Sequence, residues 1–369
     1  SKHYDLRNRV LTMANRSRVN SITITHSPLS FNRIGTDMKE QAVQFEMGDA
    51  IIASMTLEEQ IKQKAIRLGF DAAGITHAAP IDSEHADRLS AWLERGFNAK
   101  MQYMQRNLEK RLNPSELLNE AESVIVAALN YKPPKHAGCD VSHHSKGRVA
   151  NYALYEDYHQ FTKQRLRNLA DFIASIAGDD VRFKICVDSV PLAERALAVR
   201  AGLGFIARNH MMTIPQLGQE LFLAELITTL KLQTDKPASG QCSECSKCIE
   251  ACPTGALRAD GFLDANKCIS YLTIEHKADI PPDLAASIAD RLFGCDECVK
   301  ACPHRKDAPA CGNKDIRFYP ERAAMDFEQI LAMTEEEFQN QFVDSPIKRL
   351  GLQRLKRNAG ISAAWGVRQ

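Results

Sequence analysis

The chain has 369 residues, of which 44% are hydrophobic and 25% charged, and its formal net charge is +1. This near-neutral charge excludes a global attraction to nucleic acid, although local basic stretches remain. There is no run of about 18 apolar residues, which excludes a membrane-spanning helix, and the first residues lack the apolar core of a signal peptide. Eleven cysteines, most of them at cluster-type spacing, indicate a reducing compartment, so we expect a cytoplasmic protein.

Residues 1–54 differ from the rest of the chain. The first 36 residues hold six Lys or Arg and a single acid, Asp5, without a helical or strand period. One interpretation is a basic arm that binds nucleic acid. The other is a disordered or non-native extension translated from an upstream start, with Met55 as the original beginning. We favour the second, because a capped helix follows Met55 at once.

From Met55 to about residue 237, predicted helices and strands alternate along the chain. The first helix carries a capping box, formed by Thr56 and Glu59. The expected helices are 56–68, 82–95, 155–176 and 191–201, and the expected strands are 70–76, 123–131, 183–187, 211–214 and 221–228. Residues 135–147 read as a loop. This alternation predicts an α/β core for residues 55–237, with a mixed sheet flanked by helices.

A cysteine-rich module is expected over residues 238–320. It opens with C-x2-C-x2-C-x3-C-P, the ferredoxin run whose fourth cysteine ligates the other cluster. Eight cysteines suffice for two [4Fe–4S] clusters. The first predicted ligand set is Cys242, Cys245, Cys248 and Cys302, and the second is Cys252, Cys268, Cys295 and Cys298.

Zinc is the alternative for these cysteines, because C-x2-C pairs also hold structural zinc. A third cysteine at the same short spacing, followed by Cys-Pro, is not typical of zinc sites and favours the clusters. Disulfides are disfavoured, since nothing in the chain indicates secretion. Cys311 reads as a free thiol, and Cys139, His143 and His144 are left unassigned.

Asp188 is a candidate proton donor, because it follows a strand whose carboxyl end would face a ligand. From spacing alone, a local role in bonding backbone amides is the favoured alternative. His159 is not read as a cobalt ligand, because Thr162 stands where the D-x-H-x-x-G cobalamin motif has glycine. A core or helix-surface histidine is expected instead.

Residues 321–369 are expected to be helical and polar, in the manner of a truncated helical repeat. From Ser345 onward this segment contains cations and no acid, so it is either a surface for an RNA backbone or a solvated end helix. The cations are Lys348, Arg349, Arg354, Lys356, Arg357 and Arg368.

Several segments resemble the epoxyqueuosine reductase family. They are GRVANYALYEDYH at 147–159, VDSVPLAERALAVRAGLGFIARN at 187–209, CPTGAL at 252–257, LDANKCISYLTIEHK at 263–277 and GCDECVKACP at 294–303. The resemblance runs from about Met55 to Gly360.

This resemblance implies a cobalamin-binding α/β core like that of reductive dehalogenases, with cobalamin held base-off and without a protein ligand to cobalt. It also implies the last step of queuosine biosynthesis, in which epoxyqueuosine at the wobble position of tRNA is reduced to queuosine. Electrons would come from an external low-potential donor of the flavodoxin or ferredoxin type, through the two clusters, and we expect a monomer. In the family an aspartate at the position of Asp188 donates a proton, which reverses the preference for a local role.

The resemblance also indicates which residues border the cobalamin. These are Arg111, Tyr152, Asp157, Asp188, Arg195, Arg208 and Asn209. The chain departs from the family pattern nearby, where Val190 replaces a glycine, GFIARN with Ala207 replaces GWIGKN, and Ala224 replaces another glycine.

Two other functions stay open. One is a dehalogenase-like cobalamin reductase, although such enzymes usually present a tyrosine donor, and Asp188 and the missing export signal argue against it. The other is a two-cluster electron carrier with an inert α/β part. Cofactor content separates the carrier from the enzymes, because a carrier would contain iron and sulfide but no cobalamin.

Overall fold

The structure is a computed structural model that describes residues 55–135, 145–178 and 180–366. These residues belong to one compact unit that begins at Met55. The N-terminal arm lies outside the described residues, as do Cys139, His143 and His144. In the part of the chain that the structure describes, no helix combines the length and apolarity needed to cross a membrane.

The central sheet has four strands in the order β1-β2-β7-β4. The strands are β1 (Ala72–His77), β2 (Ser123–Asn130), β7 (Leu221–Thr228) and β4 (Phe183–Cys186). Every neighbouring pair is antiparallel, so the expectation of a mixed sheet is wrong here. Alternating helices and strands do not by themselves fix strand direction, because a connection that contains helices can return to the sheet at either end.

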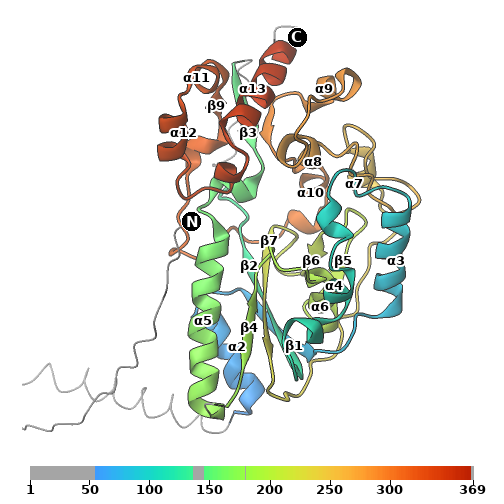
Figure 1. Ribbon diagram of the computed structural model, residues 1–369, viewed down its shortest axis with the longest axis vertical. Coiled ribbons are helices and arrows are strands. Elements are labelled where there is room, and N and C mark those ends of the chain that lie inside the picture. The colour runs from blue at the N-terminus through green and yellow to red at the C-terminus, as the bar shows by residue number, and fades with distance from the viewer. Residues whose placement is uncertain (1–54, 136–144, 179, 367–369) are drawn as a thin grey trace, which may run out of the picture. The chain divides into compact units, whose positions relative to one another are not determined.

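Helices cover both faces of this sheet (Figure 1). One face packs against α2 (Leu57–Arg67) and α5 (Tyr158–Ala177), through a core that includes Leu129 and Leu166. The other face packs against α6 (Glu194–Arg200), through a second core that includes Leu223. Strands β2 and β7 are buried along their whole length, as expected for central strands.

The helix ends show which local signals were reliable. Thr56 caps α2, and both bonds of its capping box with Glu59 are present, as predicted. Helix α3 (Ser83–Glu94) also lies where the sequence placed it. Helix α5 begins later than expected because Asp157 is its N-cap, with the carboxylate accepting a hydrogen bond from the His159 N–H. Helix α6 begins at Glu194, three residues after the expected start at Pro191.

Short elements complete the α/β part and the cysteine-rich part. The former adds α4 (Leu108–Leu112) and a hairpin of β5 (Phe205–Ile206) and β6 (Met212–Thr213). The latter contains α7 (Lys247–Glu250), α8 (Ile269–Ile274), α9 (Pro282–Ile288), β8 (Arg291–Phe293) and α10 (Glu297–Lys300).

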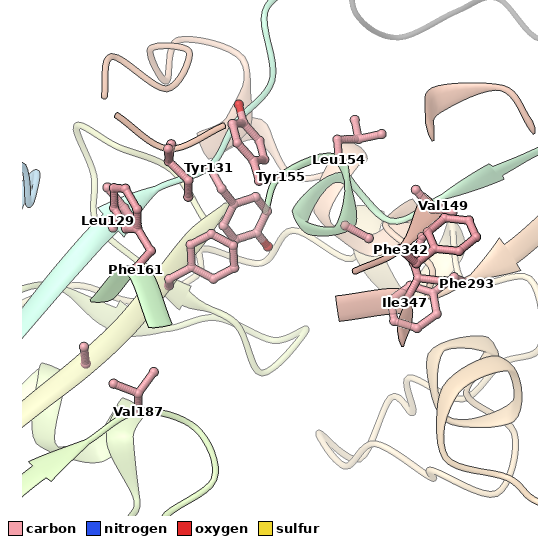
Figure 2. Packing of buried hydrophobic residues seen from close by; sticks show 14 of the residues in the cluster. Leu129, Tyr131, Val149, Leu154, Tyr155, Phe161, Val187, Phe293, Phe342 and Ile347 are labelled. Atoms are coloured by element: carbon pink, nitrogen blue, oxygen red, sulfur yellow. The ribbon is translucent and has the colours of Figure 1, made fainter. Parts of the chain in front are cut away.

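The end of the chain is helical but not uniformly polar. It contains β9 (Met325–Asp326), α11 (Phe327–Ala332), α12 (Glu335–Gln341) and α13 (Leu352–Gly366). Phe338 and Phe342 are fully buried. Phe342 gathers with Val149, Phe293 and Ile347 in a cluster that joins distant parts of the chain (Figure 2).

A second sheet connects three stretches of sequence. Strand β3 (Lys146–Val149) pairs in parallel with β8 and antiparallel with β9. Its members therefore come from the α/β part, the cysteine-rich part and the chain end. None of these three strands was expected, and β3 begins inside the stretch interpreted as a loop.

Candidate functional site

Asp188 lies just beyond the carboxyl end of β4, and both its backbone N–H and its carboxylate have hydrogen-bond partners. Its backbone is left-handed, with φ of 51°, a conformation that costs a non-glycine residue about 1–3 kcal/mol. Its N–H donates to Glu194 Oε1 at 2.8 Å, and its carboxylate Oδ2 lies 3.2 Å from His159 Nε2. The side chain keeps 56% of its surface exposed, so the carboxylate is both fixed and accessible.

His159 connects Asp188 to a second carboxylate. Its ring is 5% exposed, and Nδ1 lies 2.6 Å from Asp157 Oδ1. Arg349, near the chain end, brings Nη1 to 3.0 Å from His159 Nε2 and Nη2 to 3.2 Å from Asp157 Oδ2. His159 is thus buried, in agreement with the core interpretation, but it also belongs to a charged network around Asp188.

The pKa shifts in this network have opposite signs. The hydrogen bond from His159 lowers the pKa of Asp188 below its ordinary value, more than burial raises it. Burial alone would lower the pKa of His159, but its hydrogen bonds to Asp157 and Asp188 raise the pKa overall. Both shifts favour the proton on His159 rather than on Asp188.

Two further residues from the predicted set lie near Asp188. The Arg111 carbonyl accepts a hydrogen bond from Ala193 N–H at 3.1 Å, just before α6, and the charges of Asp188 and Glu194 act on its guanidinium. The Tyr152 ring packs 5.8 Å from that of Phe293, and its pKa is raised by burial and then by Asp296 and Asp188. Tyr152 is thus placed between the Asp188 network and the cysteine-rich part.

Arg208 and Asn209 contact the cysteine loops directly. Arg208 N–H donates to Cys242 Sγ at 3.4 Å. The Asn209 side-chain amide donates to Gln219 Oε1 at 2.8 Å and to the Cys298 carbonyl at 3.3 Å. Arg195 instead donates to the carbonyl of His210.

The charges of the cysteine thiols act on one another within two groups. In the first, the charges of Cys242 and Cys302 raise the pKa of Cys248, after burial. Burial raises the pKa of Cys302, and the charge of Cys245 raises it further. In the second, burial raises the pKa of Cys298, which is raised further by Cys295, Cys268 and Cys252.

The surroundings of these thiols suit anionic sulfur ligands. Burial raises the pKa of Cys268 and of Cys295, and this rise is opposed by the backbone N–H groups of Tyr271 and Ser270 at Cys268 and of Glu297 at Cys295. All eight thiols are free. Among the described residues, no three His, Cys, Asp or Glu side chains are placed to hold a single metal ion, so cluster ligation stays a prediction.

Two departures from the family pattern lie in packed surroundings. Ala224, on β7 opposite Ala127, is 1% exposed within the core that faces α2 and α5. Val190, two residues after Asp188, packs against the core on the α6 side. Ala224 therefore replaces glycine at a core position rather than at the accessible carboxylate.

Part of the cationic tail is engaged by the cysteine-rich part. Arg357 donates to the carbonyls of His276, Ala278 and Leu272, and Arg354 donates to that of Ile274. Lys348 and Arg349 are exposed. Sequence reasoning did not connect Arg349 or His159 with Asp188, because no spacing rule joins residues so far apart in the chain.

Comparisons with known proteins agree with this arrangement. Residues 111–189 match the family model "Epoxyqueuosine reductase QueG, DUF1730", and residues 241–305 match the "4Fe-4S double cluster binding domain". The epoxyqueuosine reductase of Vibrio cholerae is 36% identical over 304 residues, which are 82% of this chain and 81% of that protein. The Escherichia coli protein of the same name is 34% identical over 313 residues, covering 84% and 82%.

A solved structure supports the same relationship. A crystal structure of epoxyqueuosine reductase with an epoxyqueuosine-modified tRNA-Tyr stem loop superposes with a TM-score of 0.78 at 33% identity, covering 84% of this chain and 81% of that one. Identity and coverage at this level extend across both the α/β part and the cysteine-rich part. The chain therefore belongs to the epoxyqueuosine reductase family.

Proposed function

We propose that the protein reduces epoxyqueuosine to queuosine in tRNA, with Asp188 as the proton donor. The reaction takes two electrons and two protons, releases the epoxide oxygen as water and leaves an alkene. The observation that carries the proposal is the accessible Asp188 carboxylate, held 3.2 Å from His159 beside the cysteine-rich part. An alkoxide leaves poorly, so a placed acid is needed at the epoxide oxygen.

In this proposal His159 supplies the proton and Asp188 delivers it. The raised pKa of His159 favours the imidazole as the holder of the proton, and Asp188 Oδ2 is in hydrogen-bond reach of its Nε2. As the C–O bond breaks, negative charge grows on the oxygen and draws a proton through Asp188. Asp157 holds the imidazole in place, because its Oδ1 lies 2.6 Å from Nδ1.

The residues present suit a corrin and two clusters. Arg111 Nε and His210 Nε2 are buried and have no hydrogen-bond partner among the described residues, so they are available to the amide side chains of a corrin. The two thiol sets suit two [4Fe–4S] clusters. When bound, cobalamin would supply a strongly reducing metal centre and the clusters a route for single electrons. Base-off binding, and an external flavodoxin or ferredoxin as donor, are part of the proposal.

We propose the anticodon stem-loop as the macromolecular substrate. Arg349, beside Asp157 and His159, keeps 53% of its side chain exposed, and Lys348 next to it is also exposed. Cations at this position suit the phosphates that flank a modified nucleotide.

The function is tested in a bacterial strain that lacks its own epoxyqueuosine reductase. Expression of the chain should convert the epoxyqueuosine that accumulates in tRNA to queuosine, read by mass spectrometry of digested tRNA. Persistence of epoxyqueuosine, with the folded protein present and its clusters loaded, would contradict the proposal.

A further inference from the structure

A buried carboxyl group lies in the central sheet, one strand away from Asp188. Glu225, on β7, pairs with Val126 on one side and Cys186 on the other, and it is fully buried. Neither of its carboxyl oxygens has a hydrogen-bond donor among the described residues. Because Leu223 lies two residues away on the same strand and packs in the α6 core, Glu225 also points toward α6.

Glu194 occupies the space between this group and Asp188. It is the first residue of α6, and its side chain lies within hydrogen-bond reach of the Glu225 carboxyl. Its Oε1 accepts the Asp188 N–H at 2.8 Å. Two carboxyl groups this close, one of them fully buried, cannot both be ionised without strong repulsion, so the contact requires a proton between them.

No cation within the described residues forms an ion pair with either carboxyl. Arg195 donates to the His210 carbonyl, and Arg111 lies nearest to the Tyr103 carbonyl, at 3.5 Å. The titratable or charged groups that act on the pair from neighbouring elements are Asp188, His159, Arg111, Arg195, Cys186 and Tyr158.

The pKa shifts agree with a retained proton. Burial, and then the charge of Asp188, raise the pKa of Glu194 to about 7. Burial, and then Glu194, raise the pKa of Glu225 well above its ordinary value. The two groups titrate as a pair, and the pair keeps at least one proton through neutral pH.

We propose that Glu225 and Glu194 share one proton, and that the chain from Glu225 through Glu194 to the Asp188 N–H fixes the left-handed backbone of Asp188. The protonated Glu225 donates to Glu194, which stays an anionic acceptor for the Asp188 N–H. Loss of the shared proton places two repelling charges beneath Asp188 and releases its loop. Glu194 and Glu225 are positioning residues, and their importance for catalysis rests on the proposed role of Asp188.

The test is hydrogen exchange of the segment around Asp188, in the full chain purified anaerobically, between about pH 6 and pH 9. After correction for the intrinsic pH dependence of amide exchange, opening linked to loss of one proton grows up to about tenfold per pH unit. Glu225→Gln keeps the size and a hydrogen-bond donor but cannot lose a proton. In this variant the slope of loop opening against pH should therefore fall by the equivalent of nearly one proton. Any part of the slope that comes from His159 should remain.

Asp71→Asn is the matched control. Asp71 is also a carboxyl whose pKa burial raises, but it adjoins the opposite outer strand, where it accepts the Asn130 N–H. This variant should leave the pH dependence at Asp188 unchanged. If Glu225→Gln does not fold, Glu194→Gln takes its place, because it keeps an oxygen acceptor for the Asp188 N–H and leaves Glu225 without a second carboxyl group to share its proton.

An unchanged pH dependence in the Gln variant would overturn the shared proton. So would a wild-type loop whose opening shows no increase linked to proton loss up to about pH 9. Neither readout needs substrate or turnover. Failure of the positioning role is therefore distinguishable from failure of the proposed function.

Discussion

At the scale of single residues, the location of one proton decides how Asp188 works. The hydrogen bond from His159 lowers the pKa of Asp188, so in the proposed mechanism His159 holds the proton and Asp188 passes it on. An isolated aspartate with its ordinary pKa would hold almost no proton at neutral pH and would be a poor acid. In the proposed mechanism His159 supplies that proton, because its hydrogen bond to Asp157 raises the pKa of the imidazole.

Replacing His159 with Gln tests this charge state through stability. The pKa of His159 is raised from 6.5 in the folded protein, so its stabilising contribution is complete below about pH 6.5 and is lost as pH rises through the raised value. The variant should be less stable than wild type by about 1.5–3 kcal/mol at about pH 6, and by less at about pH 9. Urea unfolding at both pH values measures the two differences.

His210→Gln provides a control of opposite sign. Burial lowers the pKa of His210 to about 4, so this ring is neutral in the folded protein at neutral pH. His210 therefore destabilises the folded protein only as pH falls below 6.5. Its difference from wild type should not change between about pH 7 and pH 9. A His159 variant with the same flat response would show that His159 is neutral.

At the scale of elements, short helices present the cysteines. Cys248 is on α7 and Cys298 is on α10, each a helix of four residues. Such helices are too short to be stable alone, so they depend on their neighbours and on what the thiols bind. Cys268 and Cys302 are the N-cap residues of α8 and of a 3-10 turn.

Cys248→Ala should remove one cluster and leave the other. Total iron should fall from about eight to about four atoms per chain, because a [4Fe–4S] cluster needs four thiolates. Cys311→Ala is the control, since Cys311 belongs to neither thiol set and should leave iron unchanged. Iron and sulfide analysis of anaerobically purified protein measures both, and full iron in Cys248→Ala would contradict the ligand sets.

The elements that the sequence predicted well carry a strong local signal. The capping box at Thr56 and the continuous apolar runs of β2 and β7 depend only on neighbours in the chain. Strands β3, β8 and β9 have four residues or fewer and pair with distant segments, so no period marks them. Strand direction in the central sheet is likewise set by tertiary connections and was not predictable from alternation.

At the scale of the whole molecule, the chain end completes the site. Arg349 reaches His159 and Asp157, while the nearby Phe342 is buried in the cluster with Phe293 of β8. Cysteine spacing predicted both thiol sets and family resemblance singled out Asp188, and both stay predictions. The sequence did not reveal the roles of His159, Arg349, Glu194 and Glu225, because their contacts join segments from four parts of the chain.

The central claim is that Asp188 donates the proton in reduction of epoxyqueuosine. The most direct measurement compares wild type and Asp188→Asn, both purified anaerobically with cobalamin and clusters, on an epoxyqueuosine-containing anticodon stem-loop. Asparagine cannot donate an acidic proton, so turnover to queuosine should fall by at least roughly 100-fold while cluster and cobalamin contents stay unchanged. Wild-type turnover in Asp188→Asn would contradict the account.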